Sequence, residues 1–423
     1  MNKIQYLILI ALSLTLSHSS AQKKVKSKEQ LENAKVYRDL DEALMNKKRV
    51  YILNLDSKQL GEIPDKIFKL KNLQRLYLRS NRIKEIPVGI TVLKNLQVLM
   101  LGENEISEIP DFISEFSILE ELDLFSNKLT DVNRSVYNCS KLTHLDLSWN
   151  QITHLPDSIN KISKLERLLL SRNQLTTLPE NINFCTNISE LTLDENKLTK
   201  LPEDFGSLGK LTELNLSKNQ LAELPNSFSN LNMLTSLNLN SNKLTALPES
   251  FSSLSALETI NISNNKIKKI GNQLNIPSLT EIDASINQLY SFTANAAQLP
   301  NIVSLELELN NIKSPTSIFK PTSLETLNLS RNKIERIEAN VAQLKNLKTL
   351  NLSSNKIYSV HKSIGKLNKL EMLYLNKNAI SLLQREIGGL TSLKELHLQN
   401  NKISTYQKKN IKKYVPVGAK VYF

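Results

Sequence analysis

Residues 142–156, LTHLDLSWNQITHLP, are the stretch that decides the fold. Shifting the frame by 23 residues in either direction brings the same pattern back, as LEELDLFSNKLTDV from residue 119 and LERLLLSRNQLTTLP from residue 165. In the central copy, Asn150 stands among five apolar residues, which are Leu142, Leu145, Leu147, Ile152 and Leu155. A repeat of this length predicts one solenoid that grows by adding coils, although 423 residues would ordinarily suggest several domains.

The asparagine recurs every 22 or 23 residues through most of the chain. The series is Asn81, Asn104, Asn127, Asn150, Asn173, Asn196, Asn219, Asn242, Asn265, Asn287, Asn310, Asn332, Asn355, Asn378 and Asn401. A first, degenerate coil begins at Val50 and has Lys58 in place of the asparagine, which gives sixteen coils. Each coil supplies a short strand whose alternate leucines point inward.

The consensus LxxLxLxxNxLxxLPxxIxxLxx resembles the leucine-rich repeat in its 23-residue form, over about residues 50–406. The form is similar to that of intracellular Ras-related scaffolds and of many bacterial surface or exported proteins. The resemblance implies an α/β repeat solenoid, a right-handed arc with a concave parallel β-sheet and extended or short helical segments on its convex side. It also implies that each asparagine bonds the backbone of adjoining turns, which a polar side chain in the core requires in any case.

Both ends of the solenoid are expected to be capped, because an open end would expose apolar surface and an unpaired strand edge. Residues 22–49 are interpreted as a basic linker and an N-terminal capping helix, with a helical pattern over residues 29–46. The solenoid then occupies residues 50–403. Residues 404–423 are interpreted as a C-terminal cap, a helix followed by a last strand.

The first residues carry a separate signal. Lys3 precedes an apolar run of ten residues, LILIALSLTL, and small residues follow up to Ala21. A membrane span needs about 20 apolar residues, so residues 1–21 are interpreted as a signal peptide that is cleaved near Ala21. The chain is therefore expected to be exported, to the periplasm, the cell surface or the medium. No later stretch is long and apolar enough to span a bilayer.

Two further sets of residues recur at the coil period. Cys139 and Cys185 lie two coils apart, roughly 10 Å at about 4.8 Å per strand, which exceeds the roughly 7 Å limit for a disulfide. Both cysteines are expected to be buried and reduced. Phe205, Phe228 and Phe251 occupy a position where other coils have Ile, and we expect them to stack inside the convex wall.

The chain carries a formal charge of +13, which raises polyanions as partners. Many basic residues directly follow the repeated asparagine and should form a stripe along one edge of the coils. These residues are Lys128, Lys197, Lys243, Lys266, Lys333, Lys356 and Lys402. A solvated edge is the favoured interpretation, binding of an anionic polysaccharide is the alternative, and nucleic acid is not favoured.

The sequence contains none of the motifs that organise common active sites or metal centres, such as HExxH, CxxC, GxSxG or a phosphate-binding glycine loop. His144 lies two residues from Asp146 on an outward strand face, but no third partner completes a catalytic set. We therefore expect no enzymatic activity, no catalytic residues, no metal site and no cofactor.

The concave surface is formed by the residues six, four, two and one positions before each asparagine. In the later coils these positions hold generic small polar residues, mainly Asn and Ser. In the early coils they hold a chemically diverse set, which we predict to be the partner-binding site. The set comprises Arg75, Tyr77, Arg79, Met100, Asp123, Phe125, His144, Asp146, Trp149, Arg167, Leu169 and Arg172.

Aromatic and arginine side chains dominate the energetics of interfaces, and an exposed run of Tyr77, Phe125 and Trp149 requires an explanation. One explanation is sideways packing along the sheet, and the other is a partner site. We favour an exported, non-enzymatic scaffold that binds a protein through the N-terminal half of its concave face. The alternative is an adhesin that binds anionic glycan or another envelope polymer through the lysine edge. Met372, Tyr374 and His397 form a second, smaller cluster near the C-terminus.

Overall fold

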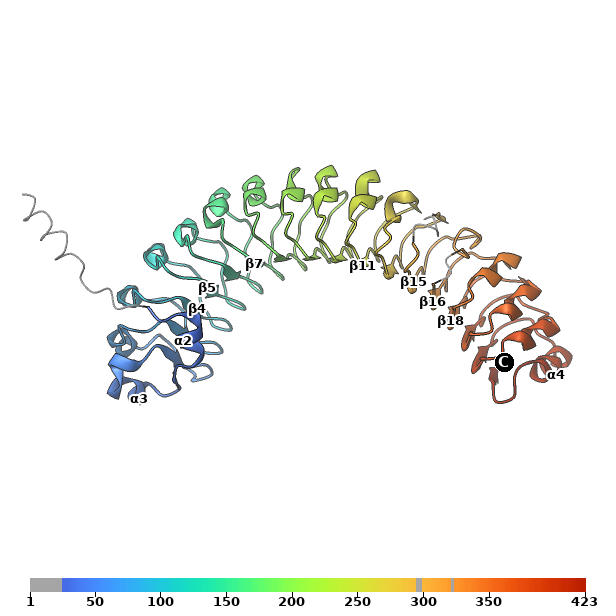
Figure 1. The fold of residues 1–423 in the computed structure, drawn as a ribbon, viewed down its shortest axis with the longest axis horizontal. Helices are drawn as coiled ribbons and strands as arrows, with labels where there is room; N and C mark the ends of the chain where they lie inside the picture. The colour runs from blue at the N-terminus through green and yellow to red at the C-terminus, as the bar shows by residue number, and fades with distance from the viewer. Residues whose placement is uncertain (1–24, 294–298, 321–322) are drawn as a thin grey trace, which may run out of the picture.

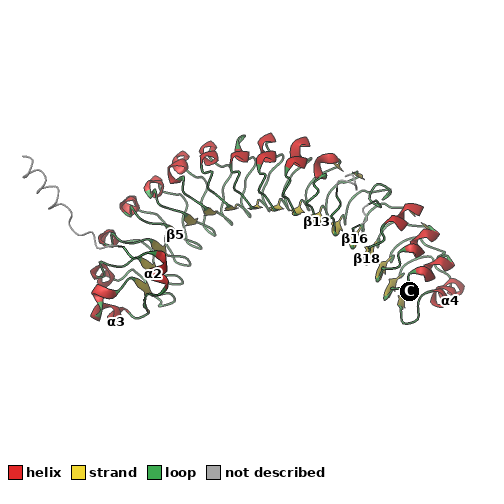
Figure 2. Ribbon diagram, viewed as in Figure 1, coloured by secondary structure: helices red, strands yellow, loops and turns green. Residues whose placement is uncertain are grey.

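The computed structural model describes residues 25–293, 299–320 and 323–423, and it is a single arc (Figure 1). Strands line the concave side and short helices line the convex side (Figure 2). In the described residues, eighteen parallel strands form the main sheet, and each pairs with the strand of the next coil. The predicted solenoid with a concave parallel sheet is confirmed.

Sixteen strands of this sheet come from the repeats, one for each predicted coil of the described chain. They are β2 (Ile52–Asn54), β3 (Arg75–Tyr77), β4 (Val98–Met100), β5 (Glu121–Asp123), β6 (His144–Asp146), β7 (Arg167–Leu169), β8 (Glu190–Thr192), β9 (Glu213–Asn215), β10 (Ser236–Asn238), β11 (Thr259–Asn261), β13 (Glu281–Asp283), β15 (Ser304–Glu306), β16 (Thr326–Asn328), β18 (Thr349–Asn351), β20 (Met372–Tyr374) and β21 (Glu395–His397). The central residue of each strand points into the core, as Leu145 does at 1% exposure.

The repeated asparagine holds neighbouring coils together. Asn150 donates from Nδ2 to the carbonyl oxygens of Leu124, Leu147 and Ser148 at 2.9, 3.0 and 3.2 Å. Its Oδ1 accepts the amide of Leu129 in the preceding coil at 2.9 Å. The side chain is buried, and these bonds replace the hydrogen bonds to water that it loses on folding. The predicted structural role of the asparagine is confirmed.

The residue before each asparagine adopts a left-handed backbone conformation, with φ between 51° and 57° from Ser80 to Asn400. None of these residues is glycine. Serine and asparagine fill many of these positions, and asparagine tolerates the conformation well. The conformation costs any residue with a Cβ about 1–2 kcal/mol, because Cβ comes close to the following carbonyl. Trp149 occupies one of these positions, with φ 57°.

Short 3-10 helices form most of the convex wall. They are η1 (Lys47–Arg49), η2 (Asp65–Lys69), η3 (Val88–Val92), η4 (Asp111–Glu115), η5 (Arg134–Asn138), η6 (Asp157–Ile162), η7 (Glu180–Phe184), η8 (Phe205–Ser207), η9 (Asn226–Asn230), η10 (Glu249–Ser253), η11 (Asn272–Leu274), η13 (Ala339–Gln343), η14 (Lys362–Lys366) and η15 (Arg385–Gly389). Phe205, Phe228 and Phe251 stack here with ring centroids 6.0 Å apart, as predicted. Cys139 and Cys185 are buried and free, also as predicted.

Four additional strands occur where neighbouring coils lack the proline that otherwise precedes the 3-10 helix. β12 (Lys269–Ile270) pairs with β14 (Ser291–Phe292), and β17 (Arg336–Ile337) pairs with β19 (Ser359–Val360). The backbone amide of His361, in the proline position, donates to the carbonyl of Ile337 at 3.0 Å. Proline has no such donor, so its absence permits this second, shorter ladder.

The N-terminal segment departs from the single helix expected over residues 29–46. It forms α2 (Lys28–Glu32), then β1 (Val36–Tyr37), which adds a strand to the sheet beside β2, then α3 (Leu40–Met45). The reason is a second helix start. Ser27 caps α2 by accepting the amide of Gln30, and Asp39 caps α3 by accepting the amide of Glu42.

At the other end, α4 (Thr405–Tyr414) follows the last repeat, and β22 (Lys420–Tyr422) pairs with β21. Ile411 is the buried residue of α4. The predicted signal peptide, residues 1–21, lies outside the described residues. Within the described part of the chain, no helix is long and apolar enough to cross a bilayer.

Candidate functional site

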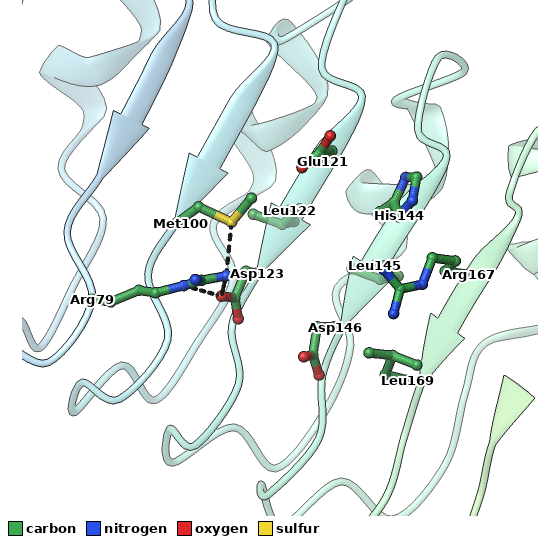
Figure 3. Close-up of a pocket in the computed structure, with 10 residues that line it drawn as sticks. All are labelled: Arg79, Met100, Glu121, Leu122, Asp123, His144, Leu145, Asp146, Arg167 and Leu169. Carbon is green, nitrogen blue, oxygen red and sulfur yellow. Dashed lines mark hydrogen bonds and ion pairs between the residues drawn. The ribbon is translucent and has the colours of Figure 1, made fainter. Parts of the chain in front are cut away.

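A hollow of about 240 Å³ opens on the concave face in the N-terminal half of the arc (Figure 3). Its lining comes from the concave side of successive coils, around β4 to β7. It is lined by Arg79, Met100, Glu121, Leu122, Asp123, His144, Leu145, Asp146, Arg167 and Leu169. Seven of the twelve residues predicted for the site therefore lie together, namely Arg79, Met100, Asp123, His144, Asp146, Arg167 and Leu169.

One wall of the hollow is an arginine that crosses a whole coil. Arg79 donates from Nε to Asp123 Oδ2 at 2.6 Å, and its Nη2 lies 2.5 Å from the same oxygen and 3.3 Å from the sulfur of Met100. Figure 3 shows this side chain reaching past Met100. Gly102 belongs to the coil that is crossed, and a Cβ there would come within 3.0 Å of the Asp123 carboxylate. The missing side chain makes room for the ion pair.

Asp123 and Asp146 are direct register neighbours on β5 and β6. Oδ1 of Asp123 accepts the amide of Phe125 at 2.8 Å, and Oδ1 of Asp146 accepts the amide of Ser148 at 2.9 Å. Burial raises the pKa of Asp146, and the charge of Asp123 raises it further. Within the described residues, Asp146 forms no ion pair, whereas Asp123 is matched by Arg79.

Two further residues of the hollow already have polar partners, and Glu121 adds a third carboxylate to the lining. Arg167 binds Glu190 in the next coil with two hydrogen bonds, at 2.6 and 3.1 Å. His144 Nδ1 lies 2.8 Å from the hydroxyl of Thr143. No nucleophile is held by a base in this arrangement, and no group of three metal-binding side chains occurs among the described residues.

Three more of the predicted residues form a row beside the hollow, which we call the aromatic edge: Phe125, Trp149 and Arg172. The rings of Phe125 and Trp149 meet edge to face, 6.1 Å apart. The guanidinium carbon of Arg172 lies 3.8 Å from the centre of the Trp149 ring. These residues do pack sideways along the sheet. Even so, Trp149 remains 47% exposed.

The remaining two predicted residues, Arg75 and Tyr77, lie on β3 at the N-terminal margin and do not line the hollow. Both are partly buried. Nε of Arg75 is buried and has no hydrogen-bond partner among the described residues. The structure therefore places these two residues beside the hollow and not within it.

Sequence reasoning missed a second, acidic hollow in the later coils, which were interpreted as generic. Glu281, Asp283 and Glu306 contribute to its lining, and burial raises the pKa of Glu306. Nearby, Ile286 and Leu309 are 46% and 42% exposed and occupy the left-handed position before the asparagine. The signal that was available is the pair of acids four residues before Asn287 and Asn310, together with apolar residues one position before them.

The smaller C-terminal cluster is extended by a residue of the last strand. His397 stacks between Tyr374 and Tyr422, with ring centroids 4.6 and 4.5 Å apart. His397 Nε2 also lies 3.0 Å from Glu395. Met372 joins the cluster through its sulfur, 3.5 Å from the hydroxyl of Tyr374. The three rings stack on one another, which favours a structural role for this cluster.

The stacked coils define a class of protein: a repeat solenoid, here with a hollow on its inner face. Comparisons with known proteins give the family. A family model for a leucine-rich repeat region matches residues 42–145, and a leucine rich repeat model matches residues 118–175, 186–244, 300–357 and 345–403. The chain belongs to the leucine-rich repeat family and is of the bacterial type.

Several solved structures share the fold. A Leptospira interrogans leucine-rich repeat protein is 34% identical, has a TM-score of 0.80, and aligns over 92% of this chain and 100% of its own. The plant peptide hormone receptor RGFR1 in complex with RGF2 is 27% identical, with a TM-score of 0.66 over 84% of this chain and 63% of the receptor. YopM from Yersinia enterocolitica, 24% identical, has a TM-score of 0.64 over 95% and 78%. No curated protein matches this chain. The family fold is typical of non-enzymatic protein-interaction domains.

Proposed function

We propose that this protein is an exported, non-enzymatic scaffold that binds a protein partner through the hollow and the aromatic edge. The observation that carries the proposal is Trp149. Other coils place varied residues in the same left-handed position, from Ser80 and Ser241 to Lys218 and Leu309, so the turn itself does not require a tryptophan. Trp149 is the single tryptophan of the chain and is 47% exposed at this position, and tryptophan is among the side chains that most often anchor interfaces.

The hollow and the aromatic edge combine the features of a protein-binding surface. Exposed aromatic and arginine side chains act as anchors, and each costs about 2 kcal/mol or more when truncated. The hollow beside them offers apolar walls and charged groups. One of the similar structures also holds a peptide hormone, since the plant peptide hormone receptor RGFR1 was solved in complex with RGF2. The concave face of the present chain is proposed to serve a comparable purpose.

A substitution series tests this proposal. Wild-type protein and the Phe125→Ala and Trp149→Ala variants are used as baits for the secreted and envelope proteins of the native cell, with quantitative mass spectrometry as the readout. Ser241→Ala is the matched control, because Ser241 takes the same place in another coil. We expect one protein to be captured by the wild type and the control and to be depleted at least about 10-fold with the variants, corresponding to about 1.4 kcal/mol. Equal capture of the same proteins by all baits would contradict the proposal.

Export is a separate part of the proposal and is supported by the sequence of residues 1–21. The mature protein should begin at Gln22. N-terminal sequencing of protein recovered from outside the cytoplasm checks this, and recovery of uncleaved protein only in the cytoplasm would contradict it.

A second candidate function is adhesion to an anionic polymer through the lysine edge. In the N-terminal half this edge is partly neutralised, because Lys128 pairs with Glu105 at 2.8 Å. Four members in the later coils are exposed and form no ion pair within the described residues, and they favour this candidate: Lys266, Lys333, Lys356 and Lys402. Polymer binding through this edge should weaken steeply between low and high salt. Binding that is insensitive to salt would exclude it.

A further inference from the structure

In many coils, the concave residue four positions before the repeated asparagine makes a hydrogen bond that stabilises the turn. In five coils it is an asparagine whose Oδ1 accepts the backbone amide two residues later, at 2.9–3.1 Å. These residues are Asn215, Asn238, Asn261, Asn328 and Asn351. Asp123 and Asp146 make the same bond with a carboxylate oxygen. The turn therefore requires an oxygen and does not require a charge.

Unlike the asparagines at this position, Asp123 and Asp146 carry negative charges when ionised, and these charges need compensation. Because Asp123 and Asp146 are register neighbours, they sit about 4.8 Å apart along the sheet, and like charges at that separation repel. Arg79 compensates Asp123. Arg167, on the strand beyond Asp146, is bound to Glu190 and acts on Asp146 only through its charge, so Asp146 has no ion pair of its own among the described residues.

Apolar side chains flank the two aspartates in register on both sides, although His144 and Arg167 also line the hollow. Met100 on β4 and Leu169 on β7 are both partly exposed, and Leu122 and Leu145 form the floor. A long basic side chain fits such a site, because its methylene stem packs on apolar atoms while its cation meets the carboxylate. Arg79 already shows this arrangement within the chain, where it passes Met100 and ends on Asp123.

We propose that the hollow receives a lysine or arginine side chain of the polypeptide partner, with its cation on Asp146 and its stem against Leu169. This inference rests on the proposed function, because it assumes that the partner is a polypeptide. The partner's cation neutralises the carboxylate of Asp146, as Arg79 neutralises that of Asp123. The neighbouring aromatic edge contacts the residues that flank the inserted side chain.

The test uses a random peptide display library panned against the full mature chain. Binders are ranked by titration of the fluorescence of Trp149, the single tryptophan of the chain. We expect binders to share a lysine or arginine, and replacement of that residue with the neutral isostere citrulline or glutamine to weaken binding at least about 10-fold. Asp146→Asn should weaken the same peptides by a similar factor, because it keeps the oxygen for Ser148 and removes only the charge.

Asp283→Asn is the matched control, since Asp283 occupies the same position in a later coil and accepts the amide of Ser285. It should leave the affinities unchanged. Binders without a basic residue, or equal affinity for wild type and Asp146→Asn, would overturn the inference. The peptide result does not depend on finding the native partner. The proposed function fails separately, when capture from native extracts does not depend on Phe125 and Trp149.

Discussion

Trp149 stands at a left-handed backbone position, and contacts with its neighbours support its ring. Its backbone is held left-handed by the coil, and its ring is supported by Phe125 on one side and Arg172 on the other. Aromatic and cation–π contacts of this kind contribute about 0.5–1.5 kcal/mol each, which is comparable to the cost of the left-handed conformation. The ring is thus held in place at little net cost and remains partly exposed.

A prediction about stability follows for Asp146, because an asparagine at this position would lack the charge but keep the hydrogen-bond acceptor. Burial raises its pKa in the folded state, so the folded protein binds this proton more readily than the unfolded chain does. The stability that this provides is present below the unfolded pKa of about 3.9 and is lost as pH rises through the higher folded pKa. We expect Asp146→Asn to be more stable than wild type at pH 7.

Urea unfolding at pH 7 and pH 3 provides the measurement. The advantage of Asp146→Asn should shrink toward pH 3, where both states of the wild type are protonated. A variant that is less stable than wild type at pH 7 would show that the carboxylate stabilises the fold, contrary to this account.

At the scale of the element, the convex wall gives a sharp contrast between two phenylalanines. Phe228 is fully buried and stacked between Phe205 and Phe251, whereas Phe184 is 59% exposed. Phe228→Ala should lower the free energy of unfolding by about 3–5 kcal/mol, because it removes buried area and leaves a cavity. Phe184→Ala should change it by less than about 0.5 kcal/mol. Urea unfolding followed by circular dichroism measures both, and equal effects would contradict the packing described here.

The sequence predicted the elements of the solenoid well and its N-terminal end less well. Leucine and asparagine spacing determines the coils, because each inward leucine and each buried asparagine has one place in the stack. The segment over residues 29–46 has helical spacing of its apolar residues but two start signals, at Ser27 and Asp39. Apolar spacing alone does not reveal the break between α2 and α3.

For the site, the sequence predicted which residues face outward and in which coils they gather. It did not predict that Arg79 crosses a coil to reach Asp123, because that contact depends on the side-chain conformation of Arg79 and on the space above Gly102. It also missed the acidic hollow around Glu306. That hollow depends on two acids in adjacent coils, which become neighbours only when the strands are in register.

At the scale of the whole molecule, the reactivity of the two buried cysteines measures how often the coils around them open. Burial raises the pKa of each thiol to about 11, so both are almost fully protonated at pH 8. Alkylation by iodoacetamide at pH 8 should therefore be at least about 100-fold slower in the native protein than in urea, since the thiolate is the reactive form and the native coils must open to expose it. Mass spectrometry of the two labelled peptides gives the rates. Fast labelling of either cysteine in the native state would indicate that its coil opens independently.

The same arc that buries the cysteines presents the early coils as one surface, and the central claim is that a protein binds there. The most direct test is a photocrosslinking amino acid placed at residue 149 or, as the control, at residue 241 in the same position of another coil. After irradiation of native cells that carry each variant, we expect one discrete protein adduct from residue 149 and none from residue 241. No protein adduct at residue 149, or the same adducts at both residues, would contradict the account.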